Sequence, residues 1–168
     1  HQDWVGADIS DNKTRVCVSK NDVVLGAYIF ENIYRSGLTE MFDKLSKKST
    51  IHILSGDNDS EREKLLKLLP KRSELTFNQK PESKLEYIKE LQSQSKKVMM
   101  LGDGLNDAGA LQQSNLGISV VDDVYSFSPS SDAIINGEKL TNLPEYINFS
   151  NFNMNVVKWS YVFSLLYN

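Results

Sequence analysis

The chain has 168 residues, of which 40% are hydrophobic and 24% are charged, and its formal net charge at pH 7 is -3. This length fits one domain of ordinary size with a real core, and the composition is that of a soluble globular protein. Without a basic excess, a general nucleic-acid-binding role is disfavoured. The single cysteine, Cys17, excludes an intramolecular disulfide and a CxxC metal site and favours a reducing, cytoplasmic setting.

The first predicted elements are a β-hairpin and a helix. Residues 1–13 are polar and predict no element. Residues 14–19 and 23–30 are both β-prone, and the turn formers at 20–22 separate them, which predicts a hairpin. Residues 36–48 carry apolar side chains at helical spacing and lysines in the last turn, where they suit the helix dipole. This segment predicts an amphipathic helix lying on a sheet.

A short apolar strand is predicted at residues 51–54, and a polar loop beginning with Ser55, Gly56 and Asp57 follows it. A helix from residue 60 to 69 comes next. A hydroxyl, a glycine and backbone N–H groups between a strand and a helix can hold an anion, because helix N-termini carry unsatisfied donors. Gly-Asp-Asn is also ordinary turn chemistry, so the loop alone leaves both interpretations open.

A helix is predicted from Pro81, a residue suited to a first turn, to about Gln94. Lys84 falls in that first turn, where a positive charge is unfavourable for the helix dipole. An anionic partner such as a phosphate would explain its position. Alternatively, Lys84 only solvates the outer face of the helix.

The stretch from residue 98 to 111 has several candidate ligand residues close together after a predicted strand. Residues 98–101 predict a buried parallel strand that ends at Gly102. Asp103 and Asp107 follow, and Asn106 is the predicted N-cap of a helix over 107–113. Two carboxylates and an amide at the carboxyl end of a parallel strand suit Mg²⁺. A capped strand-to-helix turn without a ligand is the alternative.

The remaining sequence predicts strands at 116–121 and 133–135, a Ser/Pro-containing connection at 125–131, and helix from Leu140 onward. Strands that alternate with helices predict an α/β fold with a parallel, three-layer arrangement. Residues 156–167 are strongly apolar and aromatic but shorter than the roughly 20 residues that span a bilayer. They predict either a core helix or, in our preferred interpretation, the first half of a membrane span.

Three signals thus follow one another along the chain: a hydroxyl after a strand (Ser55), a lysine at a helix start (Lys84), and an acidic pair after a strand (Asp103 and Asp107). This combination resembles the haloacid-dehalogenase superfamily, in which a Ser or Thr and a Lys hold the phosphoryl group and acidic residues hold Mg²⁺. Within it, P-type ATPases are more similar. Their Thr-Gly-Asp, Pro-x-x-Lys and Gly-Asp-Gly-x-Asn-Asp motifs correspond to residues 55–57, 81–84 and 102–107, with Ser in place of the first Thr.

The resemblance is closest to the heavy-metal transporting pumps, because Tyr167 and Asn168 stand where these pumps carry a Tyr-Asn pair in a membrane helix. Arg35 fits the Asp-x-x-Arg approach to the phosphorylation domain, although Asn32 replaces its Asp. The nucleophilic Asp of an Asp-Lys-Thr-Gly-Thr motif is absent, and residues 11–14 are interpreted as a polar loop. The resemblance therefore implies a fragment that lacks the first, mid-sheet strand and is inactive alone.

For the fold, the resemblance implies a three-layer haloacid-dehalogenase-like Rossmannoid parallel sheet with an N-terminal β-hairpin and a C-terminal partial membrane helix. Residues 1–30 would end a nucleotide-binding domain, 31–150 would form the phosphorylation domain, and 151–168 would start a transmembrane helix. For the site, Asp103 would bind Mg²⁺ and Asp107 would support it. The implied phosphoryl and nucleotide contacts come from Ser55, Gly56, Lys84 and Asn106, with Arg35 and Asp57 towards the nucleotide.

The implied activity is ATP-driven heavy-metal transport through an aspartyl phosphate, with Mg²⁺ as cofactor and ATP as substrate. The implied partners are a heavy-metal cation, with copper as the first candidate, the missing N-terminal part of the same pump, and the membrane; no nucleic acid is expected. The intact protein would be an integral membrane protein with this region on the cytoplasmic face. A non-catalytic phosphate- and Mg²⁺-binding module or a free-standing phosphatase remains the alternative.

Overall fold

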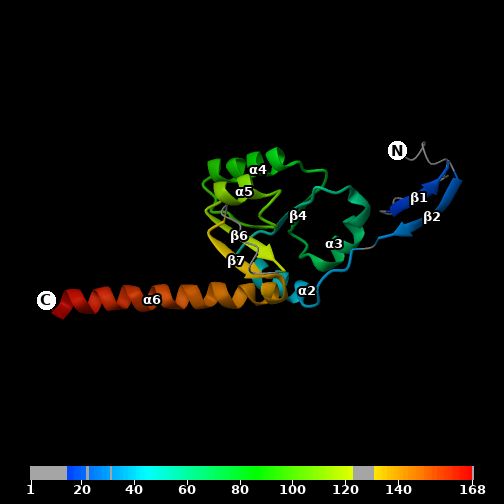
Figure 1. Ribbon diagram of the computed structural model, residues 1–168. Helices are drawn as coiled ribbons and strands as arrows, with labels where there is room; N and C mark the ends of the chain where they lie inside the picture. Colours follow the sequence, from blue (N-terminus) through cyan, green and yellow to red (C-terminus); the bar gives the residue numbers. More distant parts are fainter. Residues whose placement is uncertain (1–14, 22, 31, 123–130, 168) are drawn as a thin grey trace.

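The computed structural model describes residues 15–21, 23–30, 32–122 and 131–167. An α/β body lies in the middle of the molecule, and a hairpin and one long helix extend away from it in different directions (Figure 1). The predicted polar segment 1–13 and residues 125–130 of the predicted connection lie outside the described residues.

The hairpin consists of β1 (Arg15–Lys20) and β2 (Val23–Ile29), which pair antiparallel as predicted. Asn21 lies in the turn with a positive φ of 49°, a conformation that Asn tolerates better than most residues. Every side chain of β2 is exposed. The hairpin therefore contributes no side chains from β2 to the core of the body.

Five short parallel strands form the sheets of the body, in two separate groups. Strands β5 (Met99–Gly102), β6 (Leu116–Val121) and β7 (Ala133–Asn136) pair in that order, and β3 (His52–Leu54) pairs with β4 (Glu74–Thr76). The strands predicted at 51–54, 98–101, 116–121 and 133–135 are confirmed. Strand β4 was not predicted.

No backbone ladder joins the two groups within the described part of the chain. The expectation that a strand is missing from the middle of the sheet stays a prediction. All five strands are parallel within their groups, as the α/β interpretation requires.

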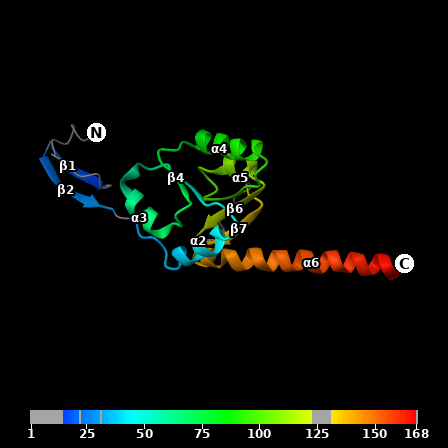
Figure 2. The ribbon, with the colours of Figure 1, turned by 180° about the vertical axis from the view of Figure 1, so that it is seen from behind.

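Helices cover both faces of the three-stranded sheet (Figure 2). On one face, α2 (Leu38–Ser46) and the start of α6 (Leu143–Tyr167) enclose the core residues Met41, Ile118, Ile135 and Leu143. On the other, α4 (Pro81–Ser93) packs on α5 (Ala108–Gln113), where Ala110 and Leu111 are buried. The three-layer prediction is therefore confirmed.

The remaining helices are short. The predicted helix at 60–69 is a 3₁₀ turn, η1 (Asp59–Glu61), followed by α3 (Arg62–Leu68). A second 3₁₀ segment, η2 (Gly137–Asn142), leads from β7 into α6.

Helix α6 is continuous through the predicted domain boundary at residue 150. Its only buried residues are Leu143 and Pro144, and the side chains from Asn148 to Tyr167 are exposed. The alternative of a core helix at 156–167 is therefore wrong for this structure. Within the described ranges, no helix is long and apolar enough to cross a membrane. A partial membrane helix beginning in α6 stays a prediction.

Candidate functional site

The carboxyl ends of both strand groups meet at one edge of the body. Lys84 lies in the first turn of α4, which follows β4, and its Nζ donates to Asp107 Oδ1 at 2.7 Å. Asp107 lies between β5 and α5. Because this bond joins a helix that follows one strand group to a loop that follows the other, the two sets of strand ends share an edge, where α/β proteins bind ligands.

The Lys84–Asp107 pair is largely buried, with only 13% and 11% of the two side chains exposed. The glycine at 102 makes this geometry possible, since a Cβ added there would lie 2.7 Å from Asp107 Oδ2. The Asp107 carboxylate is therefore held between the lysine and the backbone of β5. Lys84 therefore does not merely solvate the outer face of α4, because it has an anionic partner within the chain, Asp107; a contact from Lys84 to phosphate stays a prediction.

Asp103 is exposed and organises the loop between β5 and α5. Its Oδ1 accepts hydrogen bonds from the backbone N–H groups of Leu105 and Asn106 at 3.0 and 3.1 Å, and its Oδ2 accepts one from the Asn106 side chain at 3.1 Å. Burial raises the pKa of Asp103, but these bonds and one from the Asp107 backbone outweigh it, so the pKa lies below its ordinary value. The Asp103 carboxylate is consequently ionised at neutral pH.

Asn106 was predicted to cap the following helix, and this prediction is wrong. Helix α5 begins at Ala108, and its N-cap residue is Asp107, which makes no side-chain capping bond. The Asn106 amide is bound to Asp103 instead. A positive φ of 80° at Gly104 turns the backbone sharply, so that the loop closes on Asp103 and the helix starts one residue later.

The loop after β3 is tied to the chain before α4. The backbone of Ser55 is bonded on both sides, to Thr76 O and from Gln79 N, each at 2.9 Å. The Ser55 hydroxyl accepts the backbone N–H of Asp57 at 3.2 Å. The Ser55 hydroxyl thus lies at the end of β3, next to the segment that carries Lys84, and anion binding by this loop stays a prediction.

Arg35 lies over the ends of β6 and β7. Its Nη2 is 2.6 Å from Asp122 Oδ1, and both side chains are partly exposed. Of the predicted site residues, only Lys84 with Asp107 and Asp103 with Asn106 are in direct side-chain contact within the described chain. Sequence reasoning missed Asp122 because it belongs to no motif.

The carboxylates at the carboxyl edge suit Mg²⁺ better than a metal that takes all its ligands from the protein. Within the described ranges, no group of three or more His, Cys, Asp or Glu side chains is arranged to hold a metal ion. Mg²⁺ usually takes one or two carboxylates and keeps several waters. The ionised, exposed carboxylate of Asp103 fits that requirement, whereas Oδ1 of the Asp107 carboxylate is bound to Lys84.

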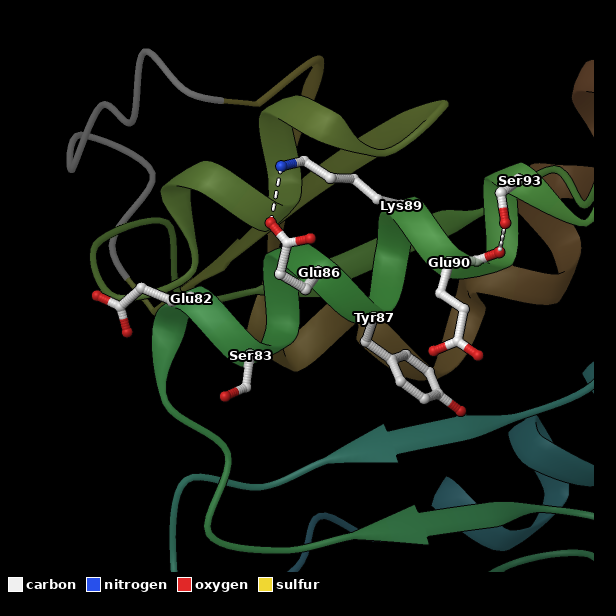
Figure 3. A pocket seen from close by; sticks show the side chains of 7 residues that line it. All are labelled: Glu82, Ser83, Glu86, Tyr87, Lys89, Glu90 and Ser93. Atoms are coloured by element: carbon white, nitrogen blue, oxygen red, sulfur yellow. Dashed lines mark hydrogen bonds and ion pairs between the residues drawn. The ribbon is translucent and has the colours of Figure 1, made fainter.

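A pocket lies along α4, from Glu82 in the first turn to Ser93 at the end of the helix (Figure 3). Its charged lining is mainly acidic, with Glu82, Glu86 and Glu90 against one lysine, Lys89. Tyr87 points from it towards the β3–β4 sheet, where its hydroxyl donates to Glu74 at 2.8 Å and lies 2.9 Å from His52 Nδ1. An acidic lining repels phosphate, so this pocket is a poor candidate for the anion site.

Comparison with known proteins identifies the family that the chain resembles. Residues 4–115 match the family described as haloacid dehalogenase-like hydrolase. The chain is 28% identical over 160 residues to the chloroplastic copper-transporting ATPase PAA1 of Arabidopsis thaliana, covering 94% of this chain and 17% of that protein. The chain spans about a fifth of the length of such relatives.

Two solved structures have a similar fold. A catalytic CPx-ATPase domain, CopB-B, is 30% identical with a TM-score of 0.61, over 76% of this chain and 51% of that one. A zinc-transporting PIB-type ATPase is 25% identical with a TM-score of 0.64, over 92% of this chain and 25% of that one.

Proposed function

Because the chain belongs to the haloacid dehalogenase-like hydrolase family, we propose that it forms part of the catalytic region of an ATP-driven heavy-metal cation pump of the P-type ATPase class. The observation that carries this proposal is the meeting of the buried Lys84–Asp107 pair and the ionised Asp103 loop at one carboxyl edge. A cation and a ligand carboxylate held there suit a transferring phosphoryl group. The named relatives are metal pumps.

The proposed reaction is phosphoryl transfer from ATP to an aspartate supplied by another segment of the same protein, followed by hydrolysis. Catalysis of this kind depends mainly on positioning and charge stabilisation. Lys84 supplies a point charge to the phosphoryl oxygens, and Asp107 holds its ammonium group in place. The Ser55 hydroxyl and the Gly56 N–H donate to the same oxygens.

Asp103 holds Mg²⁺ in this proposal, with Asn106 fixing the orientation of its carboxylate. When bound, the metal neutralises charge on the phosphoryl group. A supporting metal contact from Asp107, a phosphate contact from Asn106, and nucleotide contacts from Arg35 and Asp57 complete the proposed site.

The wider assignment belongs to the same proposal. Residues 1–30 end a nucleotide-binding domain, residues 31–150 form the phosphorylation domain, and residues 151–168 begin a membrane helix, with the catalytic region on the cytoplasmic face. Copper is the first candidate for the cargo, since it is named for the Arabidopsis relative; the solved zinc pump makes zinc the next to test.

The decisive experiment measures phosphoenzyme formed from γ-labelled ATP by the full-length protein in membranes. We expect Asp103→Asn to reduce Mg²⁺-dependent phosphoenzyme at least tenfold, because it removes the ligand charge. Asp43→Asn is the matched control, since Asp43 is an exposed carboxylate on α2. Equal levels in the two variants would contradict the site assignment.

The same preparation tests the alternatives. Steady phosphate release from a phosphomonoester by the pure 168-residue chain, lost in Asp103→Asn, would favour a free-standing phosphatase. Binding of Mg²⁺ and phosphate by the chain without any phosphoenzyme in the full-length protein would favour a non-catalytic binding module.

A further inference from the structure

Two consecutive residues, Tyr34 and Arg35, contact opposite sides of the carboxyl edge. They lie in the segment that leads into α2. The Tyr34 hydroxyl donates to Glu61 Oε2 at 3.3 Å, and Glu61 belongs to η1, which follows β3. The Arg35 guanidinium donates to Asp122 Oδ1 at 2.6 Å, and Asp122 directly follows β6. One short stretch of chain therefore reaches the loops of both strand groups.

On the β3 side, the contact is partly buried. Glu61 also accepts a hydrogen bond from Lys64 Nζ at 3.2 Å, so its carboxylate is held from two directions. Burial and the Glu61 carboxylate raise the pKa of Tyr34, and Asp57 lies near enough to contribute. Through Glu61, Tyr34 is bonded to the 3₁₀ turn η1, which follows the loop that carries Ser55, Gly56 and Asp57.

On the β6 side, the Arg35–Asp122 ion pair lies directly against Gly137. A Cβ added to Gly137 would lie 2.7 Å from Arg35 Nη2 and 2.8 Å from Asp122 Oδ1. The Asn136 side chain donates to the Asp122 backbone oxygen at 3.2 Å and accepts from Glu138 N at 2.8 Å. Asp122 is thus anchored to the turn between β7 and η2, and Gly137 leaves room for the guanidinium above it.

These contacts matter because no ladder connects β3–β4 to β5–β6–β7 in the described residues. In the layer formed by α4 and α5, the two groups are linked by the Lys84–Asp107 pair. We propose that residues 34–37 act as a strap across the carboxyl edge, and that Tyr34 and Arg35 are positioning residues which keep the Ser55 loop in register with the Asp103 loop. This inference rests on the proposed function, in which both loops hold one phosphoryl group.

The ion pair of the strap is exposed. The Arg35 and Asp122 side chains are 44% and 84% exposed, and an exposed ion pair contributes little to stability. Breaking the contacts of Tyr34 and Arg35 should therefore let the Ser55 loop and the Asp103 loop move relative to each other without unfolding the body. The effect to look for is a wider spread of distances between the loops.

The test uses the 168-residue chain with Cys17→Ser and spin labels on cysteines placed at Asp59 and Gln112, two exposed positions behind the two loops. Electron–electron resonance then gives the distribution of label distances. We expect a narrow distribution in the parent chain, at least a twofold wider one in the double variant Tyr34→Phe/Arg35→Gln, and intermediate widths in the single variants. An unchanged width in the double variant would overturn the strap.

Two further variants sharpen the result. Gly137→Ala places a methyl group against the Arg35–Asp122 ion pair and displaces it, while both charged groups remain. It should therefore widen the distribution of label distances as much as Arg35→Gln. Lys44→Gln is the matched control, because it breaks another exposed ion pair, with Glu145 at 3.9 Å, that does not cross the edge. A control variant as broad as Gly137→Ala would also overturn the proposal.

The positioning role has its own readout, the dissociation constant for inorganic phosphate in the presence of Mg²⁺, measured without nucleotide. We expect Gly137→Ala to weaken phosphate binding at least fivefold and to leave the dissociation constant for Mg²⁺ alone unchanged. Wider distances with unaltered phosphate affinity would refute the positioning role. A parent chain that bound no phosphate would count against the proposed function, while the distance distributions would still decide the strap.

Discussion

Lys84 illustrates how far a single residue can be interpreted from sequence. A lysine in the first turn of a helix opposes the helix dipole, so an anionic partner was one interpretation and a solvated outer face was the other. The structure supplies one within the chain itself, the carboxylate of Asp107 at 2.7 Å. In the proposed function, Asp107 therefore orients the Lys84 ammonium group before it contacts the phosphoryl group.

This buried pair leads to a stability prediction. Removing one partner leaves an uncompensated buried charge, so Lys84→Met should lower the free energy of unfolding by roughly 3 kcal/mol, whereas Lys84→Met/Asp107→Leu should cost less. Lys89→Met is the control, since its ion pair with Glu86 is exposed and should be worth less than about 1 kcal/mol. Urea unfolding measures all three. A double variant less stable than Lys84→Met would contradict the argument.

Asp103 yields a prediction for pH. Its folded pKa is lowered, so it contributes stability above its unfolded pKa of about 3.9, and this stability is lost as the pH falls through the folded value. Asn106→Ala removes the amide that donates to Oδ2. We expect the pKa of Asp103 to rise and the acid loss of stability to begin at a higher pH. Carbon NMR of the Asp103 carboxyl measures this, and Gln112→Ala should leave that pKa unchanged.

Other contacts of the carboxyl edge could not be predicted from sequence. Arg35 and Asp122 are 87 residues apart, and Tyr34 and Glu61 are 27 apart. No periodicity or motif connects such positions, because the contacts arise only when loops from different strands reach one edge. Asp103, Asp107 and Lys84 were predictable because strand ends and a helix start place them locally.

At the level of elements, short apolar runs were reliable guides to the strands. Residues 98–101 and 116–121 combine apolar side chains with flanking glycines or polar residues, and both are strands within a residue of the predicted limits. Strand β4 has only one large apolar residue, Leu75, between Glu74 and Thr76. Its extended form depends on pairing with β3, which a local pattern cannot reveal.

Two glycines in neighbouring elements should respond in opposite ways to alanine. A Cβ at Gly117, in β6, would lie 2.5 Å from the Leu111 backbone oxygen, which cannot move aside, so Gly117→Ala should cost about 3 kcal/mol. A Cβ at Gly109, in α5, meets only Leu85 Cδ2 at 3.9 Å. Gly109→Ala should therefore stabilise by about 0.5 to 1 kcal/mol through helix propensity. Thermal or urea unfolding that showed equal costs would contradict this packing.

For the molecule as a whole, the sequence predicted the layers and their order but not how the body is held together. Helical and strand periodicity indicate which segments cover a sheet, and α2, α4, α5 and α6 lie where an α/β fold requires. The division into two strand groups and the contacts that cross it depend on tertiary pairing. The unusual feature at this scale is α6, which leaves the body after its first turns (Figure 1).

The far part of α6 gives the last prediction. Trp159, Phe163 and Leu166 are 62%, 65% and 77% exposed, whereas Leu143 at the start of the helix is 4% exposed. Ending the chain after Phe149 should therefore change the free energy of unfolding by less than about 0.5 kcal/mol, as expected for exposed positions. Leu143→Ala, the control, should cost about 2 to 5 kcal/mol because it opens a cavity in the core.

Urea unfolding of the full chain, the shortened chain and Leu143→Ala shows whether the apolar side chains of the far part of α6 stabilise the body, as Leu143 does. Burying a large apolar side chain stabilises a protein by about 1.5 to 3 kcal/mol. If the tail packed on the body, its removal would therefore lower the free energy of unfolding by several kcal/mol. That result would support a self-contained binding module. An unchanged free energy would mean that these side chains do not stabilise the body, as expected if they serve a contact outside it, such as the proposed membrane.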